Sequence, residues 1–396
     1  MTRAQRALLF LVYFNLGICS PILSLLLLSK GASLQTLPLA LGAYSATVTL
    51  FEVPSGILAD LIGRKRVFLL SCAFNIATSV LLWGAGHYRL LLLAMILNGL
   101  GRAFASGTLE AVFIEDAVRR GGAQSLRAVT GQLSLCQNIA LMLGALVGGA
   151  LPARNGYGAQ MLLRLVCVCA ATVLCAVSVR ETRPAPDARR ATLRSHLQDC
   201  AAALRKEHKI TGLLVCSAAL GVFLFFIETY WQSAFLALAG EKSRPLLGAV
   251  STLGFGMQSA GNLLIRRMPV RSEWRWYFGL RVLIALGTLL FAPQLGVAGF
   301  LVAYGLTYLL LGGMEVLEQA LLNRMVPNAQ RASLLSISSL SLQAGCLSAS
   351  LIAAAAVGIL GFTGLFGLGG GAVLLGTSVP ALQSRAQRKG AAAPRQ

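Results

Sequence analysis

Charged side chains interrupt several of the long apolar runs in this sequence of 396 residues. Ionised groups in such surroundings are costly and indicate functional sites by default. A carboxylic acid in a medium of low dielectric constant retains its proton at neutral pH and releases it when water reaches it. The side chains placed to bind protons reversibly in this way, together with a cationic partner, are Glu52, Glu110, Glu315, Glu318 and Arg102.

Arg102 admits three roles. It could take part in proton coupling, anchor an anionic ligand, or serve as the structural partner of Glu52, since a buried charge almost always needs a mate. Glu52 also has a structural alternative. It stands close to Pro54 and Gly56 in the run LFEVPSG, where it could satisfy backbone groups freed in a bent helix.

A second pattern is the stretch GILADLIGRKR, residues 56–66, in which a dense cluster of charge separates two apolar runs. Its glycines permit a tight turn and a close approach of helix backbones. Glu115 and Asp116 end a later run at the same level, so we expect Asp116 to pair with Arg64. The alternative is a set of solvated charges worth at most about 1 kcal/mol. The residues of this charged turn and its expected partner are Gly56, Asp60, Gly63, Arg64, Lys65, Arg66 and Asp116.

The elements that carry these residues follow from the composition. Hydrophobic residues make up 56% of the chain and charged residues 12%, which is more apolar surface than a soluble core can bury. The net charge of +20 does not indicate nucleic-acid binding, because the basic residues lie in short gaps between apolar runs. We therefore predict an all-α polytopic protein in a lipid bilayer. Runs of about twenty apolar residues predict twelve spans near 7–28, 37–60, 67–86, 90–116, 126–150, 159–180, 210–239, 245–266, 275–294, 297–323, 332–357 and 361–383.

Basic residues are unevenly distributed over the gaps. Of the 34 Lys and Arg, 26 lie on the side of the N-terminus and five on the other, with Arg102, Arg164 and Arg281 inside spans. This bias predicts that both termini are cytoplasmic. Residues 181–209 form a long polar segment, which we interpret as a cytoplasmic linker with an amphipathic surface helix at 193–206. Trp274, Trp276 and Tyr277 suit an interfacial aromatic belt.

The charged turn resembles the motif G-x-L-A-D-x-x-G-R-K-R between the second and third helices of the major facilitator superfamily of transporters, and every fixed position is met. The resemblance implies two pseudo-symmetric six-helix bundles, 1–180 and 210–383, joined by the linker and followed by a cytoplasmic tail, 384–396. Weak repeats between the halves, such as Gly99-Leu100 and Gly305-Leu306, agree with a duplicated unit.

The same resemblance implies roles for individual residues. Asp60 would close the cytoplasmic gate, facing the start of the helix near residues 331–333, where a helix dipole favours an anion. The element GALVGG, residues 144–149, resembles G-P-x-x-G-G of the drug/proton antiporters, with Ala145 in place of the proline. Helices 1, 4, 7 and 10 line the central cavity in that superfamily. Residues of these four helices, together with polar residues near the middle of other spans, give the candidate substrate contacts. They are Asn15, Arg102, Gln137, Asn138, Glu228, Gln258, Tyr304, Tyr308 and Gln343.

These features predict a monomeric transporter that exports a small organic molecule in exchange for protons, without a cofactor. The short loops and the excess of Arg over Lys, 28 to 6, favour the inner (plasma) membrane of a bacterium. One alternative is transport of a specific, anionic metabolite through Arg102. Another is a transporter-shaped sensor or scaffold. No nucleophile with a base, metal-ligand spacing among the cysteines and histidines, or phosphate loop indicates an enzyme or a metal site.

Overall fold

A computed structural model describes residues 1–122, 125–180, 208–267, 272–291, 293–325 and 331–391. Every regular element in these ranges is an α-helix or a short 3-10 helix. The chain divides into two compact units, one made of Met1–Leu193 and Gln232–Gly256, the other of Arg194–Trp231 and Met257–Gln396. The first unit therefore includes residues that follow the predicted linker.

The helices of the first unit begin at the N-terminus. Their bounds are α1 Arg3–Cys19, α2 Leu23–Ser29, α3 Leu37–Ile62, α4 Arg64–Gly84, α5 Tyr88–Ala105, α6 Thr108–Gly121 and α7 Ser125–Ser178. The end of α9 (His208–Ala239), the 3-10 helix η2 (Glu241–Leu246) and the start of α10 (Leu247–Arg267) belong to the same unit. The remaining elements of the second unit are α11 Glu273–Gly287, η3 Thr288–Phe291, η4 Pro293–Leu295, α12 Gly296–Met325 and α13 Arg331–Ala391.

Several predicted spans are confirmed as helices, but their breaks differ from the prediction. Gly156 and Gly361 have φ angles of 63° and 62° and divide α7 and α13 into two arms each, as the paired spans require. The first predicted span is bent by 53° between α1 and α2. The fourth is interrupted between α5 and α6, where Gly107 has a φ of 67°. A side chain at such an angle is strained, so glycine is needed at these breaks.

Length and composition support a polytopic protein. In the described ranges, eight helices are long and apolar enough to cross a membrane, or nine if the bent pair of α1 and α2 is one span. One of the eight is the 43-residue stretch Ile337–Val379, which is longer than a single span requires and covers most of two predicted spans. The arrangement of the described helices is consistent with the twelve predicted membrane spans. The last helix continues to Ala391, beyond the predicted start of the tail.

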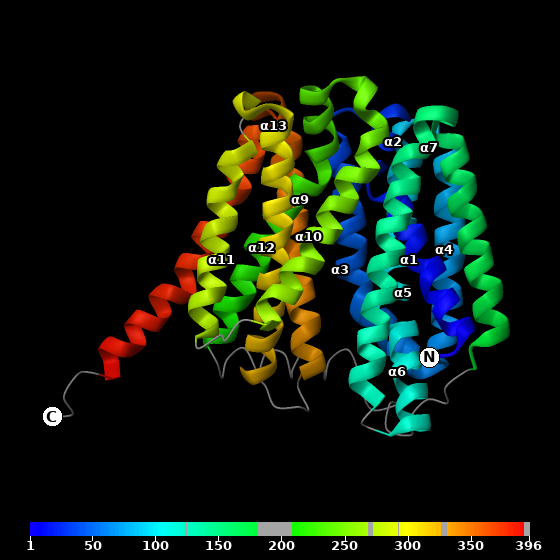
Figure 1. The fold of residues 1–396 in the computed structure, drawn as a ribbon, viewed down its shortest axis with the longest axis horizontal. Helices are drawn as coiled ribbons and strands as arrows, with labels where there is room; N and C mark the ends of the chain where they lie inside the picture. The colour runs from blue at the N-terminus through cyan, green and yellow to red at the C-terminus, as the bar shows by residue number, and fades with distance from the viewer. Residues whose placement is uncertain (123–124, 181–207, 268–271, 292, 326–330, 392–396) are drawn as a thin grey trace. The chain divides into compact units, whose positions relative to one another are not determined.

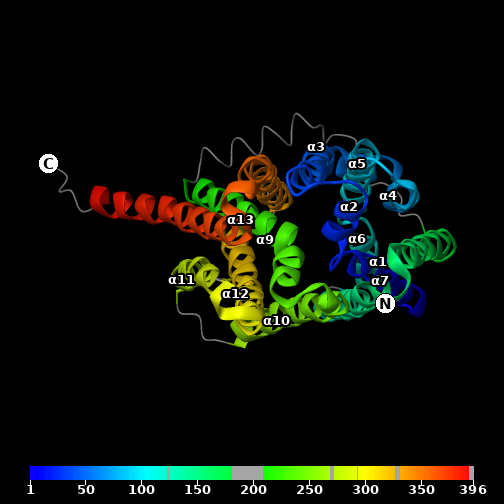
Figure 2. The same cartoon turned by 90° about the horizontal axis from the view of Figure 1, so that it is seen from above.

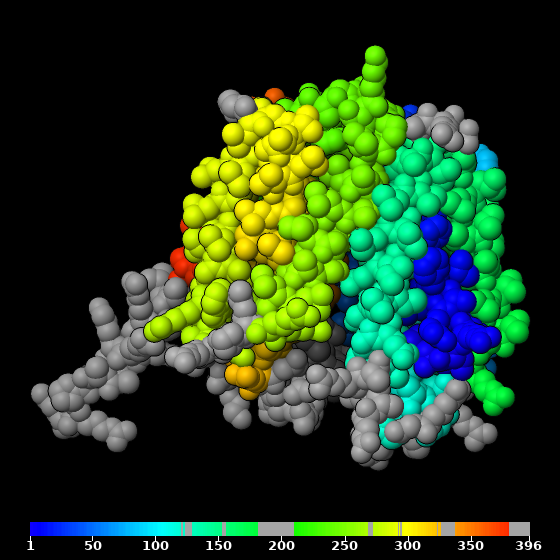
Figure 3. All heavy atoms as spheres, viewed as in Figure 1, coloured from blue at the N-terminus to red at the C-terminus, as the bar shows by residue number. Residues whose placement is uncertain are grey.

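Glycines bring the helices of the first unit into close contact. A Cβ atom at Gly144 or Gly148 would overlap the backbone of α1 near Gly17 and Ile18, and one at Gly149 would overlap Gly248 of α10. α1 lies beside α7 in both ribbon views (Figures 1 and 2) and is visible between the two arms of α7 on the surface (Figure 3). Small residues thus replace side-chain packing by backbone contact, as is typical inside membranes.

Similar contacts join the helices of the second unit. Gly221 of α9 meets the backbone of α13 at Leu342, and Gly312 of α12 meets the backbone of α10 at Gln258. Figure 2 shows α9 between α12 and α13. Tyr277 is completely buried in this unit, so its predicted place in the interfacial belt is wrong, whereas Trp276 is 42% exposed. Tyr277 is buried because its hydroxyl has polar partners inside the protein.

Candidate functional site

The charged turn between α3 and α4 is held by contacts to two other helices of the first unit. Gly63, with a φ of 102°, lets the chain reverse between them. The Arg64 guanidinium lies 2.5 Å from the Glu115 carboxylate of α6 and 3.9 Å from that of Asp60. Lys65 donates a hydrogen bond of 2.7 Å to the carbonyl of Ala176 at the end of α7. The turn therefore connects α3, α4, α6 and α7, and Arg66 is exposed.

Three expectations about this turn need correction or fall outside the structure. Arg64 pairs with Glu115, and the predicted pair with Asp116 is wrong: Asp116 accepts a hydrogen bond of 2.8 Å from Gln5 of α1. Gly56 does not serve close packing, because no described atom lies within 4 Å of a Cβ built on it. The expected partner of Asp60 is the helix start near residues 331–333, whose side chains are outside the described part of the chain.

The break between α5 and α6 brings two of the predicted proton-binding residues together. Arg102 lies in the last turn of α5 and Glu110 in the first turn of α6. A cation near a helix C-terminus and an anion near an N-terminus are both favoured by the helix dipoles. Arg102 is exposed and interacts electrostatically with Glu52, Glu110 and the hydroxyl groups of Tyr13 and Tyr44.

The Glu110 carboxylate is the centre of this cluster. Its Oε1 atom accepts hydrogen bonds from the Tyr13 hydroxyl of α1 and, at 2.8 Å, from the Gln137 amide of α7. Ser55 joins α3 to the same region, because its hydroxyl donates to the carbonyl of Ala103 at 2.8 Å. Glu52 and Glu110 both interact electrostatically with Arg102, and residues of five helices, α1, α3, α5, α6 and α7, come together here. We call Glu52, Arg102, Glu110, Tyr13, Tyr44 and Gln137 the first-unit cluster.

In the second unit, Glu228 of α9 lies beside an aromatic cluster formed by Tyr304 and Tyr308 of α12 and Trp231 of α9. The Tyr308 hydroxyl donates a hydrogen bond to Glu228 Oε1. The Tyr304 ring lies 4.7 Å from that of Tyr308 and 5.1 Å from that of Trp231, centroid to centroid. The three rings are buried, but the Glu228 side chain is exposed. In the described part of the chain, no basic side chain forms an ion pair with it.

The other two predicted carboxylates of the second unit, both on α12, have different surroundings. Glu315 is exposed and accepts a hydrogen bond of 3.3 Å from Gln258 of α10. Glu318 accepts hydrogen bonds from Ser217 of α9 at 2.5 Å and from Tyr277 of α11 at 3.1 Å. Tyr277 also contacts the guanidinium of Arg281, one turn along α11, at 3.3 Å. Glu318 is therefore part of a buried polar network that links three helices.

Arg281 was not predicted as a site residue. It is completely buried and donates to Thr377 of α13 and to the carbonyl of Cys216, at 2.9 Å in both cases. The sequence does contain a sign of this network: Arg281 lies inside one apolar run and Glu318 inside another, and each needs a polar partner. Tyr13, Tyr44 and Trp231 were also missed, because aromatic residues are common in membrane helices and carry no local sign of polar contacts.

The remaining predicted contacts are dispersed. Asn15 is buried in α1, and its side-chain oxygen has no partner among the described residues. Asn138 of α7 and Gln343 of α13 are half-buried. Another buried cation lies in the second arm of α7: Arg164 is 3% exposed, and its Nε and Nη1 atoms lack partners in the described ranges.

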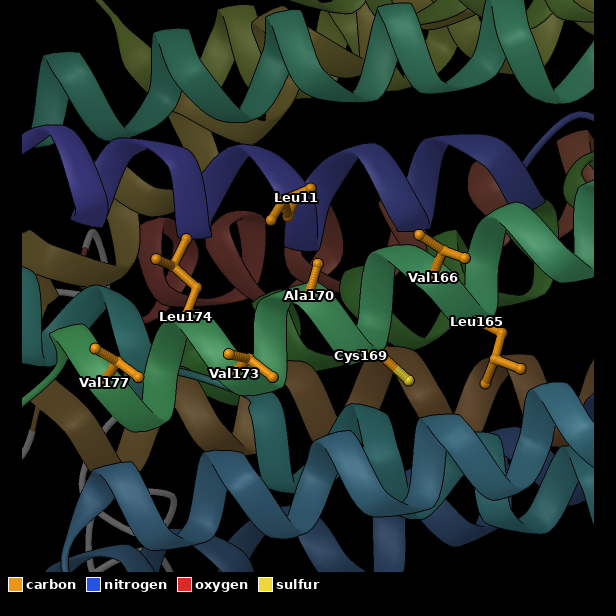
Figure 4. A pocket seen from close by; sticks show the side chains of 8 residues that line it. All are labelled: Leu11, Leu165, Val166, Cys169, Ala170, Val173, Leu174 and Val177. Atoms are coloured by element: carbon orange, nitrogen blue, oxygen red, sulfur yellow. The ribbon is translucent and has the colours of Figure 1, made fainter.

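An open groove of about 850 Å³ lies on the surface of the first unit. Figure 4 shows its lining, which is Leu11 of α1 with Leu165, Val166, Cys169, Ala170, Val173, Leu174 and Val177 of α7. None of the predicted site residues is among them. This surface offers apolar contacts suited to lipid chains and no polar group for a charged ligand. Among the described residues, no group of three or more His, Cys, Asp or Glu could hold a metal ion.

Comparison with known proteins identifies the fold. The family model of the Major Facilitator Superfamily matches residues 7–314. A search of curated proteins finds no match. Among solved structures, the nucleoside transporter NupG has a TM-score of 0.76 and 12% identity, with 96% of this chain and 98% of that chain covered. The POT family transporter PepTSo gives 0.77 and 14%, with 98% of both chains covered. A bacterial homologue of the iron transporter ferroportin, in its inward-facing state, gives 0.71 and 19%, with 96% and 98% covered.

Proposed function

Because the chain belongs to the Major Facilitator Superfamily, we propose that it is a secondary active transporter that exports a small organic molecule in exchange for protons. The observation that carries this proposal is the first-unit cluster, in which Glu110 holds hydrogen bonds from two helices beside an arginine at a helix break. Discontinuous helices of this kind form substrate and ion sites in membrane transporters.

Proton coupling follows from the chemistry of the cluster. Glu52 and Glu110 both interact electrostatically with Arg102, so in the proposed mechanism one carboxylate takes up a proton while the other remains the anionic partner of the arginine. Protonation of Glu110 would weaken the hydrogen bonds that its oxygen accepts from Tyr13 and Gln137, because bonds to an ionised acceptor are stronger than bonds to a neutral one. A proton would thereby loosen α1 and α7 from α6.

The charged turn supplies the corresponding gate. Arg64 and Lys65 attach the turn to the middle of α6 and the end of α7, and Asp60 remains exposed nearby. In the proposed cycle, two bundles, 1–180 and 210–383, rock about a central site and the turn closes the cytoplasmic side. We place residues 181–209 and 384–396 in the cytoplasm with both termini, and the protein, as a monomer, in a bacterial plasma membrane.

The proposal of outward transport rests on the resemblance of GALVGG, residues 144–149, to the element of the drug/proton antiporters. Gly144, Gly148 and Gly149 pack α7 against α1 and the start of α10, a contact that serves helix packing in either transport direction. The named substrates of the structural neighbours include nucleosides and peptides, which agrees with a small organic molecule as cargo. Transport of an anion through Arg102 is the alternative, but Glu52 and Glu110, which both interact electrostatically with that guanidinium, would compete with an anionic substrate for it.

The test is proton flux in proteoliposomes loaded with a pH-sensitive dye. Candidate compounds are added to purified protein reconstituted without other carriers, and the initial rate of proton movement is recorded. Wild-type protein is expected to move protons in the opposite direction to at least one compound. Glu110→Gln should abolish coupled flux, and Arg102→Ala should reduce it strongly. Glu241→Gln is the matched control, because Glu241 lies in η2, outside the first-unit cluster, and forms an ion pair with Arg244.

Two outcomes would contradict the proposal. Substrate movement by wild-type protein with no proton flux would exclude proton coupling. Full coupled flux in Glu110→Gln would exclude the first-unit cluster as the proton site, and Glu52→Gln would then be the next variant to measure.

A further inference from the structure

Glu228 is an unusual carboxylate in the second unit. It lies in the apolar helix α9, its side chain is exposed, and no described basic residue pairs with it. One of its oxygens, Oε1, accepts the hydrogen bond from Tyr308. The other, Oε2, has no hydrogen-bond partner among the described residues. An ionisable side chain inside a membrane span costs free energy, so its presence indicates a functional role by default.

The aromatic cluster gives this carboxylate a fixed orientation and an apolar background. Tyr308 donates to Oε1, the Tyr304 ring packs against Tyr308 at a tilt of 43°, and Trp231 packs against Tyr304 at a tilt of 45°. These rings are 6%, 2% and 0% exposed, so they exclude water behind the carboxylate. Electrostatic attraction is stronger beside a low-dielectric wall than in bulk water. The free oxygen is therefore a preorganised acceptor for a positive charge that arrives from the accessible side.

The donor set argues against a metal ion. Mg²⁺ and Ca²⁺ need about six oxygen ligands, whereas Glu228 offers one free oxygen, and the nearby groups are phenol rings and the thiol of Cys346 on α13. An ammonium group needs only one carboxylate and tolerates apolar neighbours. We propose that Glu228, oriented by Tyr308 and backed by Tyr304 and Trp231, binds the cationic group of an organic substrate. The proposal deepens the function proposed above and rests on it for the transport step, but not for binding.

The test is equilibrium binding to the full-length protein, purified in detergent. Tetraphenylphosphonium is the probe, and tetraphenylborate, an anion of the same shape, is its charge-reversed counterpart. Wild-type protein is expected to bind the cation and not the anion at a saturable site. Glu228→Gln should weaken cation binding at least tenfold, which corresponds to about 1.4 kcal/mol. Tyr308→Phe should weaken it by less, since it removes the orienting hydrogen bond and keeps the charge.

Glu241→Gln, at an exposed carboxylate that pairs with Arg244 in the 3-10 helix η2, serves as the control and should bind the cation like the wild type. Unchanged cation binding by Glu228→Gln, or equal saturable binding of both probes, would overturn the proposal, as would a wild-type protein that binds neither. Variants are compared only if their thermal unfolding matches the wild type. Charge-selective binding that depends on Glu228 but occurs without proton-coupled transport would support this site and refute the proposed transport function, so the two failures are distinguishable.

Discussion

The buried network around Arg281 offers the sharpest prediction about stability. Its guanidinium is completely buried in the second unit and donates to Thr377, to the carbonyl of Cys216 and to Tyr277, which in turn donates to Glu318. Substitution of Arg281 by Met keeps much of the apolar stem and removes the charge. The partners then remain buried without their donor, and the hydrogen-bond chain from Arg281 through Tyr277 to Glu318 is broken.

The magnitude follows from these contacts. Each hydrogen bond to a charged group contributes about 1.5–3 kcal/mol, but desolvation of the guanidinium offsets part of the sum. Breaking a buried charged network by removing one member costs about 3–5 kcal/mol. At about 2–4 °C per kcal/mol for a unit of this size, a loss of about 3 kcal/mol lowers the melting temperature by about 6–12 °C. The double variant with Glu318→Gln should recover part of this loss.

Tryptophan fluorescence during heating suits the measurement, because Trp231, Trp274 and Trp276 all lie in the second unit. Arg275→Met is the matched control: Arg275 is an exposed arginine on the same helix, and its substitution should change stability by no more than about 0.5 kcal/mol. A melting temperature of Arg281→Met within about 2 °C of the wild type would refute the reasoning, since it would mean that the network contributes little net free energy.

Three further predictions concern the first unit. Gly148→Leu should destabilise by about 1–3 kcal/mol and abolish transport, because its side chain would overlap the carbonyl of Ile18; wild-type melting and flux would show that α1 and α7 need no contact there. Arg164→Met should raise the melting temperature, since it removes a buried charge without described partners; a fall would reveal a bound partner. Glu115→Arg should impair transport while changing stability by under about 1 kcal/mol, and the double exchange with Arg64→Glu should restore flux if their pair is the gate contact.

The apolar runs predicted the helices well because membrane insertion depends on properties that are local in sequence. Runs of about twenty residues, separated by charge, are enough to locate a span. The breaks were harder to predict. Gly107 lies within a stretch long enough for one continuous span, and its positive φ of 67° shows that α6 begins as a separate helix after it. The sequence contained a glycine at this point, but many glycines in the same helices serve packing instead.

The partners of charged residues could be predicted only to within a helix turn. Glu115 and Asp116 are adjacent, yet one binds Arg64 and the other binds Gln5. Consecutive residues on a helix point about 100° apart, so a small error in the helix's rotation exchanges their partners. The contact of Tyr277 with Glu318 joins residues on two helices, and no local pattern indicates which faces of those helices meet.

The geometry of α6 explains how one proton could affect the distant gate. In the first turn of this 14-residue helix, Glu110 accepts a hydrogen bond from Tyr13 of α1, and past the middle of the helix Asp116 accepts one from Gln5, also of α1. Glu115, next to Asp116, holds the charged turn through Arg64. Helices α1 and α6 are thus connected at two points about two turns apart. Release of the Tyr13–Glu110 contact would remove one constraint on the tilt between the two helices, while the Gln5–Asp116 contact remains. A tilt about the Gln5–Asp116 contact would move Glu115 relative to Arg64. The effect of proton binding at Glu110 would then be transmitted to the gate by movement of the whole helix α6 and not by a series of side-chain rearrangements.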